Sequence, residues 1–374
     1  MSLPLSRRSL LKGTGLALTA GLLPEAWAAP AKLEEKVPEE KEIIHLNLNE
    51  NAWGPSPKVG PAIEREFSRL SRYANDKLAE TFAEQVAAYE RVPVEQVVLG
   101  EILGALGLWL GSQGGPGGEF IYSTPGYLAV VNAASHVGGV GAPVPLNDRY
   151  ENDLPALEAR VNAKTRALYL INPHNPTGTV SDAGAFRQFL ERTSQRAPVI
   201  VDEAYLEFTN DFESRSAVSL TREGANVLVF RTFDKIHGLA GIPIGYTIAP
   251  KKLAADLKAQ GVGDAESLGR LNIVAASAAL SDTAQVAHIR STVATERQKW
   301  NAVLDELNLP HTQSATNFVF FHAKRPQNEL AAAMRERGID IGRTFPPYTD
   351  WARITIGLPE ENRAAQAALR ASIR

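Results

Sequence analysis

Short apolar runs alternate with helical patterns from about residue 60 onward, and this alternation restricts the fold more than any other feature of the chain. Helical patterns lie near residues 76–90, 126–136 and 182–195. The apolar runs are VVLG (97–100), EFIYS (119–123), ALYLINP (167–173), PVIVDEA (198–204), VLVFRTF (227–233) and IPIGYTI (242–248). Strands that alternate with helices are typical of a parallel sheet covered by helices. Because several runs are apolar throughout, we expect strands buried on both faces.

The pattern changes after residue 251. Longer helical segments follow, notably 283–308, and they are interrupted by TNFVFF (316–321) and ARITIG (352–357). We therefore predict an α/β protein with a mostly parallel sheet in a large domain, residues 60–250, and a smaller α+β C-terminal domain, residues 251–374. Residues 29–59 are predicted to form an N-terminal arm that packs with the small domain.

The amino terminus has the composition of an export signal. Arg7 and Arg8 are followed by Leu10, Leu11 and Lys12, then by an apolar segment and by Ala-Trp-Ala at residues 26–28. The apolar segment of about 11 residues is too short to cross a bilayer of about 30 Å as a helix, which disfavours a membrane anchor. Residues 1–28 resemble a twin-arginine signal peptide, and the alternative is an unrelated basic amphipathic start. We therefore expect a periplasmic protein.

Composition bounds the kind of partner. With 374 residues and 44% hydrophobic content, the chain can bury a substantial core. Its net charge is −3, and no basic run with interleaved aromatic residues suggests a nucleic-acid groove. The histidines show no metal-ligand spacing, and cysteine is absent from the sequence. We expect a small-molecule partner, no nucleic acid and no metal site.

Polar residues follow the predicted strands at the edge of the sheet where open α/β folds bind ligands. These positions include NPHNPTG (172–178), VDEAY (201–205) and Lys235. Taken singly they are a turn, a helix cap and a surface lysine. Taken together they match the needs of pyridoxal phosphate: a lysine amine for a Schiff base and a carboxylate against the pyridine nitrogen. Lys235 and Asp202 are the candidates.

The motifs NPHNPTG, VDEAY, TFDKIHGLAG and ARITIGLPEEN resemble those of class I/II pyridoxal-phosphate aminotransferases, closest to the histidinol-phosphate aminotransferase group. LNLNENAWGPSP (46–57), SRYAND (71–76) and TNFVFF (316–321) extend the similarity over about residues 43–374. The resemblance implies a PLP-dependent transferase fold of type I, pyridoxal 5'-phosphate as cofactor, an amino acid and a 2-oxo acid as substrates, and a homodimer.

The resemblance also implies a role for each matching residue. Lys235 forms the Schiff base and shuttles a proton, and Asp202 pairs with the pyridine nitrogen. Arg353 binds the substrate carboxylate as a bidentate partner. The other implied contacts are Asn175 and Tyr205 to the ring oxygen, Tyr127 stacked on the ring, Asn49 and Trp53 at the substrate entrance, and Tyr73 reaching into the neighbouring subunit's site.

The expected phosphate site departs from the family pattern. The family has a hydroxyl residue before the lysine and an arginine eight residues after it, whereas this chain has Asp234 and Pro243. The family binds the phosphate with a Gly-Ser/Ala-Asp/Asn-Glu turn. The corresponding segment of this chain is GEILGAL at residues 100–106, with Glu101 near the expected phosphate position. A carboxylate 4 Å from a phosphate charge costs about 4 kcal/mol per charge pair at a dielectric constant near 20. We expect a remodelled phosphate site that involves Thr232, Asp234 and backbone amides at Ile102 and Leu103, with Arg231 or His237 as substitutes.

The function predicted from the sequence is transfer of an amino group between an amino acid and a 2-oxo acid. One alternative is another pyridoxal-phosphate reaction on the same scaffold, namely β-elimination, decarboxylation or racemisation. A second alternative is a non-catalytic ligand-binding protein with a degraded phosphate site. The group resemblance does not assign histidinol phosphate as substrate, because an exported enzyme would need that biosynthetic intermediate outside the cytoplasm.

Overall fold

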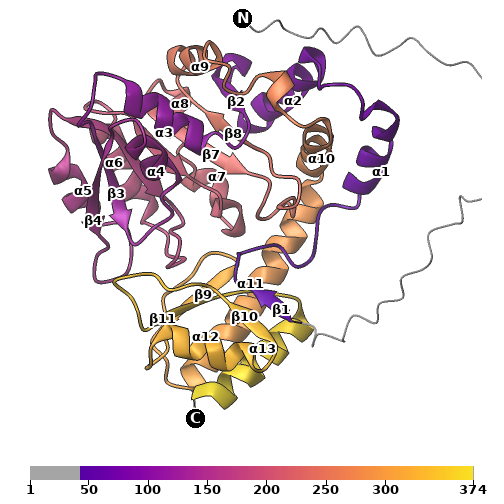
Figure 1. Cartoon of the computed structure of the whole chain (residues 1–374), viewed down its shortest axis with the longest axis vertical. Helices are drawn as coiled ribbons and strands as arrows, with labels where there is room; N and C mark the ends of the chain where they lie inside the picture. The colour runs from indigo at the N-terminus through magenta and orange to yellow at the C-terminus, as the bar shows by residue number, and fades with distance from the viewer. Residues whose placement is uncertain (1–42, 374) are drawn as a thin grey trace, which may run out of the picture. The chain divides into compact units, whose positions relative to one another are not determined.

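A computed structural model describes residues 43–373 of the chain, and its centre is a mostly parallel sheet (Figure 1). In this part of the chain seven strands form that sheet in the order β2-β8-β7-β6-β5-β3-β4. Only β8 runs antiparallel to its neighbours there, β2 and β7. The strands are β2 (Val97–Leu99), β3 (Glu119–Thr124), β4 (Val140–Pro145), β5 (Thr165–Ile171), β6 (Val199–Asp202), β7 (Val227–Thr232) and β8 (Gly245–Ile248).

Side chains alternate between two apolar clusters on opposite faces of the sheet, as expected for strands buried on both sides. In β6, Val199 and Val201 belong to one cluster and Ile200 to the other. Helices α2 (Asp76–Glu90), α6 (Ala183–Thr193) and α10 (Arg270–Leu280) contribute to the first cluster. Helices α3 (Leu103–Ser112), α4 (Ala129–Ser135) and α9 (Lys251–Lys258) contribute to the second. The prediction of a doubly covered sheet is confirmed.

Local sequence explains where several helices begin. The side chain of Asn75 accepts a hydrogen bond from the amide of Leu78 and so caps α2. Aspartates cap three further helices in the same way. The remaining helices before α11 are short: α1 (Val59–Glu64), α5 (Leu154–Arg160), α7 (Phe212–Arg215), α8 (Val218–Arg222), and the 3-10 turns η1 (Phe67–Arg69), η2 (Val94–Gln96), η3 (Leu206–Phe208) and η4 (Ala265–Ser267).

Strand β4 was absent from the sequence prediction. Its sequence, VGAPVP, contains two prolines and a glycine, which read as a loop. β4 lies at the edge of the sheet and pairs only with β3 among the described strands. An edge strand tolerates proline because one side of its backbone has no ladder partner.

The C-terminal part, orange to yellow in Figure 1, has its own core. β9 (Phe318–His322) pairs antiparallel with β11 (Trp351–Thr355), and β1 (Ile44–Leu46) pairs parallel with β10 (Ile339–Ile341). Helices α11 (Thr283–Glu306), α12 (Gln327–Arg335) and α13 (Pro359–Ile373) pack with these strands. The small C-terminal domain is thus present, while the predicted boundaries at 28, 59 and 250 stay predictions.

The predicted signal peptide lies outside residues 43–373. Within that range the helices are all too short or too polar to cross a bilayer.

Candidate active site

The carboxyl ends of the parallel strands surround a cavity of about 370 Å³. β6 ends at Asp202, β7 ends at Thr232, and Lys235 follows β7 after one short turn. The predicted site residues that line this cavity are Asn49, Leu103, Tyr127, Asn175, Asp202, Tyr205, Thr232, Asp234, Lys235 and Arg353. The fold therefore brings together residues that are up to 304 positions apart between Asn49 and Arg353 (353 − 49).

Three predicted site residues do not line the cavity. Ile102 is buried and precedes the first turn of α3. Trp53 is half-buried and packs against the core of the C-terminal part. Tyr73 is 81% exposed, and its carbonyl oxygen accepts a 2.6 Å hydrogen bond from Arg270. Their proposed contacts with cofactor, substrate or a second subunit stay predictions.

Asp202 is buried at the floor of the site, at 3% exposure. Its Oδ2 accepts a 3.0 Å hydrogen bond from the hydroxyl of Tyr169, and its Oδ1 accepts one of 3.0 Å from the amide of Ala204. Burial raises the pKa of Asp202 to about 6, although these hydrogen bonds and Lys235 lower it. A buried carboxylate without an ion pair is poised to receive a cationic partner, and a protonated ring nitrogen is such a group.

Amide and phenol groups form a connected set on the other side of the cavity. The Asn49 amide donates a 3.1 Å hydrogen bond to the Tyr205 hydroxyl, and the Asn175 amide lies 3.5 Å from the same oxygen. Asn49 adopts a left-handed backbone conformation with φ 59°, and its backbone N–H donates a hydrogen bond to Thr355 Oγ1. These bonds hold the Tyr205 hydroxyl in place, where its own proton remains available to a ligand oxygen.

Arg353 reaches the same cavity from β11 and is 7% exposed. Its two terminal nitrogens donate to Asn175 Oδ1 at 2.6 Å and to the carbonyl of Asn47 at 2.7 Å. Its Nε is buried without a hydrogen-bond partner, and no carboxylate within residues 43–373 forms an ion pair with it. Burial lowers the pKa of Arg353 to about 10. The guanidinium thus sits in a place that suits an anionic ligand.

The end of the cavity at which α3 begins carries carboxylates where an anionic ligand would need donors. Thr232 Oγ1 donates a 2.7 Å hydrogen bond to Glu101 Oε1 and accepts one of 3.1 Å from the amide of Asp234. One carboxylate oxygen of Asp234 is buried without a hydrogen-bond partner. Leu103 and Gly104 of the first turn of α3 also line the cavity, and first-turn amides lack partners within their helix.

These contacts fit the cofactor unequally at its two ends. A buried carboxylate, an amine, a phenol and an amide suit the pyridine ring and its substituents. The phosphate end offers the α3 amides and the Thr232 hydroxyl, beside two carboxylates. Pro243 supplies no cation, and its carbonyl accepts a 2.8 Å hydrogen bond from Asn272.

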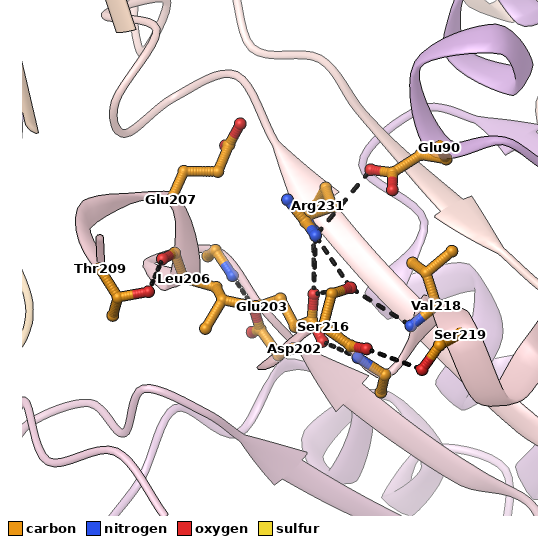
Figure 2. Close-up of polar contacts among 12 residues, drawn as sticks. Glu90, Asp202, Glu203, Leu206, Glu207, Thr209, Ser216, Val218, Ser219 and Arg231 are labelled. Carbon is orange, nitrogen blue, oxygen red and sulfur yellow. Dashed lines mark hydrogen bonds and ion pairs between the residues drawn. The ribbon is translucent and has the colours of Figure 1, made fainter. Parts of the chain in front are cut away.

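Arg231 and His237 are not substitutes for the missing phosphate ligand. Figure 2 shows Arg231 turned toward Glu203 and Ser216, where its Nε and Nη2 donate hydrogen bonds of 3.0 Å each. His237 Nε2 lies 3.5 Å from Glu207 Oε1. Both side chains are buried and neither lines the cavity. Each contacts a buried glutamate, whose charge would otherwise lack a partner.

We expect Arg231→Ala to lower the free energy of unfolding by about 3–5 kcal/mol, because it leaves Glu203 buried without its cation. Burial raises the pKa of Glu203 to about 7 even with Arg231 present, and the variant raises it further. The folded state then binds a proton that the unfolded state does not, so the loss is larger at pH 8 than at pH 6. Denaturant unfolding at both pH values measures this.

Arg192→Ala is the matched control, since it removes an exposed arginine paired with Glu158 at 2.8 Å. Its effect on the free energy of unfolding should be small, because solvent screens an exposed ion pair. Equal losses for the two variants would contradict the role assigned to Arg231.

Tyr169, Arg343 and Phe345 belong to the site but were absent from the sequence prediction. Tyr169 contacts Asp202, and the only signal for it was a hydroxyl in the otherwise apolar strand ALYLI. Arg343 and Phe345 line the cavity near Arg353, and the guanidinium carbon of each arginine lies over the Phe345 ring, at 4.5 and 5.0 Å from its centroid. Nothing in GRTFPP distinguishes these two residues from an ordinary loop.

Residues 43–373 contain no cluster of three or more histidine, cysteine or acidic side chains able to hold a metal ion.

Comparison with known proteins agrees with this geometry. Residues 41–369 match the family model described as aminotransferase class I and II. The chain is 34% identical over 351 residues to the histidinol-phosphate aminotransferase of Staphylococcus saprophyticus, which covers 92% of this chain and 95% of that protein. It is 31% identical over 340 residues to histidinol-phosphate aminotransferase 2 of Carboxydothermus hydrogenoformans. That alignment covers 89% of this chain and 92% of the relative.

Among solved structures, histidinol-phosphate aminotransferase from Sinorhizobium meliloti, in complex with pyridoxal-5'-phosphate, aligns with a TM-score of 0.78. The two are 27% identical, and the alignment covers 90% of this chain and 92% of that one. The chain belongs to the class I and II aminotransferases, enzymes that transfer amino groups with pyridoxal 5'-phosphate.

Proposed function

We propose that Lys235 binds the cofactor and moves the proton of the transfer reaction. Some of the residues around it bind the cofactor ring, and others bind the substrate. The cofactor supplies an aldehyde and an electron-accepting ring. With the cofactor bound, the negative charge of Asp202 would hold a proton on the ring nitrogen, Tyr205 and Asn175 would donate to the ring oxygen, and Tyr127 would cover the ring. When the substrate amine takes the place of Lys235 on the cofactor, the bond to Lys235 breaks, and the released Nζ would accept a proton from the substrate α-carbon as a general base.

Arg353 is the residue that supports a substrate with a carboxylate group. Its buried guanidinium has an unpartnered Nε and no carboxylate partner within residues 43–373. A substrate carboxylate placed there forms the bidentate pair that guanidinium geometry favours. This supports amino acids and 2-oxo acids as the two substrates.

Arg343 favours substrates with a second anionic group. It is exposed at the cavity and shares the Phe345 ring with Arg353. Two guanidinium groups on one ring attract two negative charges more strongly than one. A dicarboxylic amino acid has two such groups. Histidinol phosphate, which the names of the relatives mention, is an amino alcohol phosphate without a carboxylate for Arg353.

The test is a set of half-reactions with the cofactor-loaded enzyme. Acidic amino acids should convert the cofactor to its aminated form and release 2-oxo acids, which chromatography quantifies. A product that has lost its carboxylate or side chain, or an inverted amino acid without 2-oxo acid, would support the alternative reactions instead.

Arg353→Gln should raise KM for the carboxylate substrate by about 30-fold to 5,000-fold, since truncating one partner of a buried charge pair costs about 2–5 kcal/mol. Arg297→Lys is a matched control. Arg297 is also a partly buried arginine whose pKa burial lowers to about 10, but it donates to the Thr316 carbonyl and does not line the cavity. An unchanged KM in Arg353→Gln would remove Arg353 from the substrate site.

The proposal includes a homodimer. Phe67, Leu70 and Tyr73 are 57%, 57% and 81% exposed, a concentration of apolar surface within one short segment. Tyr73 from a second subunit would complete the cavity that it does not reach in its own chain. Light scattering of the purified protein measures the molar mass, and a monomer at working concentration would contradict this.

Export through the twin-arginine route is also part of the proposal. It is supported by Arg7-Arg8 with the apolar segment and the Ala-Trp-Ala sequence that follow. Replacement of both arginines by lysine should retain the full-length protein in the cytoplasmic fraction. Equal periplasmic amounts of both forms would contradict it.

A further inference from the structure

Glu101 is seated inside the cavity by contacts from two strands. Its Oε1 accepts the 2.7 Å hydrogen bond from Thr232 at the end of β7. It also lies where Gly245, the first residue of β8, has no side chain: a Cβ there would be 2.7 Å from Oε1 and 2.5 Å from the Arg231 carbonyl oxygen. Gly245 does not have the positive φ that demands glycine, so the close approach explains the residue. Although Glu101 as a residue is exposed, its carboxylate is fixed at the α3 end of the cavity.

The charged groups that face Glu101 are mostly acidic. Asp234 and Asp202 raise its pKa, Lys235 and the Thr232 hydrogen bond lower it, and Tyr127 lies within electrostatic range. Burial, the largest effect, raises the pKa of Glu101 to about 7. Near neutral pH this carboxyl group therefore exists in both protonation states.

We propose that Glu101 binds the cofactor phosphate as a neutral carboxylic acid that donates its proton to a phosphate oxygen. The inference rests on the cofactor placement proposed above. An ionised Glu101 would repel the phosphate, whereas a protonated one is a short, strong donor. Protonation also makes Glu101 a weaker acceptor for the Thr232 hydroxyl, so that hydroxyl can turn to the phosphate as a second donor, beside the amides of Leu103 and Gly104.

The proton balance of this assignment is simple. When Glu101 is already protonated, cofactor binding moves no proton to it. When Glu101 is ionised, binding takes up one proton from solvent. Cofactor affinity should therefore weaken by about tenfold per pH unit once the pH exceeds about 7, in addition to any pH dependence from Lys235 or the phosphate itself.

The experiment compares the dissociation constant of pyridoxal 5'-phosphate for the full chain and for Glu101→Gln between pH 6 and 8.5, by equilibrium dialysis. The side-chain amide of this variant is a neutral donor at every pH, so a ratio of the two constants cancels the pH dependence that both proteins share. We expect a ratio, native over variant, near one at pH 6 and about 30 at pH 8.5. Asp234→Asn is the second variant; it keeps Glu101 and should keep the tenfold change per pH unit, with the onset moved to lower pH because a charge that raises the pKa of Glu101 is gone.

Calorimetry in buffers of different ionisation enthalpy gives an independent readout. At pH 8, native protein should take up one proton more than Glu101→Gln on binding the cofactor. A ratio that stays flat with pH, or a pH dependence lost in Asp234→Asn instead, would overturn the assignment to Glu101. If neither protein shows the visible Schiff-base band, the proposed role of Lys235 fails as well, and the two failures are thereby distinguished. Equal melting temperatures of the cofactor-free proteins confirm that the variants fold.

Discussion

Lys235→Ala should abolish the visible absorbance band of the cofactor-loaded enzyme and lower kcat on the order of 10⁴-fold. Lys235 is half-buried in the cavity, follows the end of β7 and lies within electrostatic range of Asp202 and Glu101. Its removal deletes both the amine that binds the aldehyde and the group that moves the α-proton. Absorbance spectra and steady-state rates with an acidic amino acid and a 2-oxo acid measure the two effects.

Two controls separate chemistry from charge and folding. Lys235→Arg keeps a cation in the cavity but has no amine able to form a Schiff base, so it should lose the band as the alanine variant does. Lys252→Ala removes a lysine that is exposed on α9 and paired with Asp256, and it should leave the rate unchanged. A visible band of native intensity in Lys235→Ala would show that another amine binds the cofactor.

Asp202→Asn should lower kcat by about 10²-fold to 10³-fold, because the amide has nearly the shape of the carboxylate but lacks its charge. The native side chain accepts hydrogen bonds from Tyr169 and from Ala204 in a buried site, so solvent does not replace the lost charge. The variant should still show the visible band, since Lys235 is intact. Rate measurements on fully loaded enzyme keep weaker cofactor binding out of the comparison.

The activity of the native enzyme should also depend on the protonation of Asp202. Burial raises the pKa of Asp202 to about 6 in the cofactor-free protein, and a cationic ring nitrogen then lowers that pKa. Native activity should fall at a pH below about 6 as the carboxylate takes up a proton, and Asp202→Asn should lack this limb. Tyr169→Phe removes a hydrogen bond that lowers the pKa of Asp202, so its acid limb should move to higher pH. A kcat for Asp202→Asn within about threefold of the native value would contradict the role of its charge.

Two residues of the candidate site were predictable because each is the last residue of a strand. Asp202 and Thr232 are the last residues of β6 and β7, and parallel strands gather their carboxyl ends at one edge. The helical pattern predicted near residues 76–90 is confirmed as α2, and the Asn75 side chain caps its first turn. β4 was missed because proline suits an edge strand, and whether a strand is at an edge depends on pairing that the local sequence does not contain.

The sequence by itself determined the α/β class and the candidates Lys235 and Asp202, since periodicity and strand-end motifs are local properties of the chain, and its resemblance to the class I/II aminotransferases implied the cofactor and Arg353. Only the tertiary structure decided what surrounds the expected phosphate position. It turned Arg231 and His237 toward buried glutamates, placed Glu101 against Thr232 in the space left by Gly245, and set Arg343 beside Arg353 on one aromatic ring. Side-chain direction and burial set these protonation states and partners, and both depend on contacts between residues far apart in the chain.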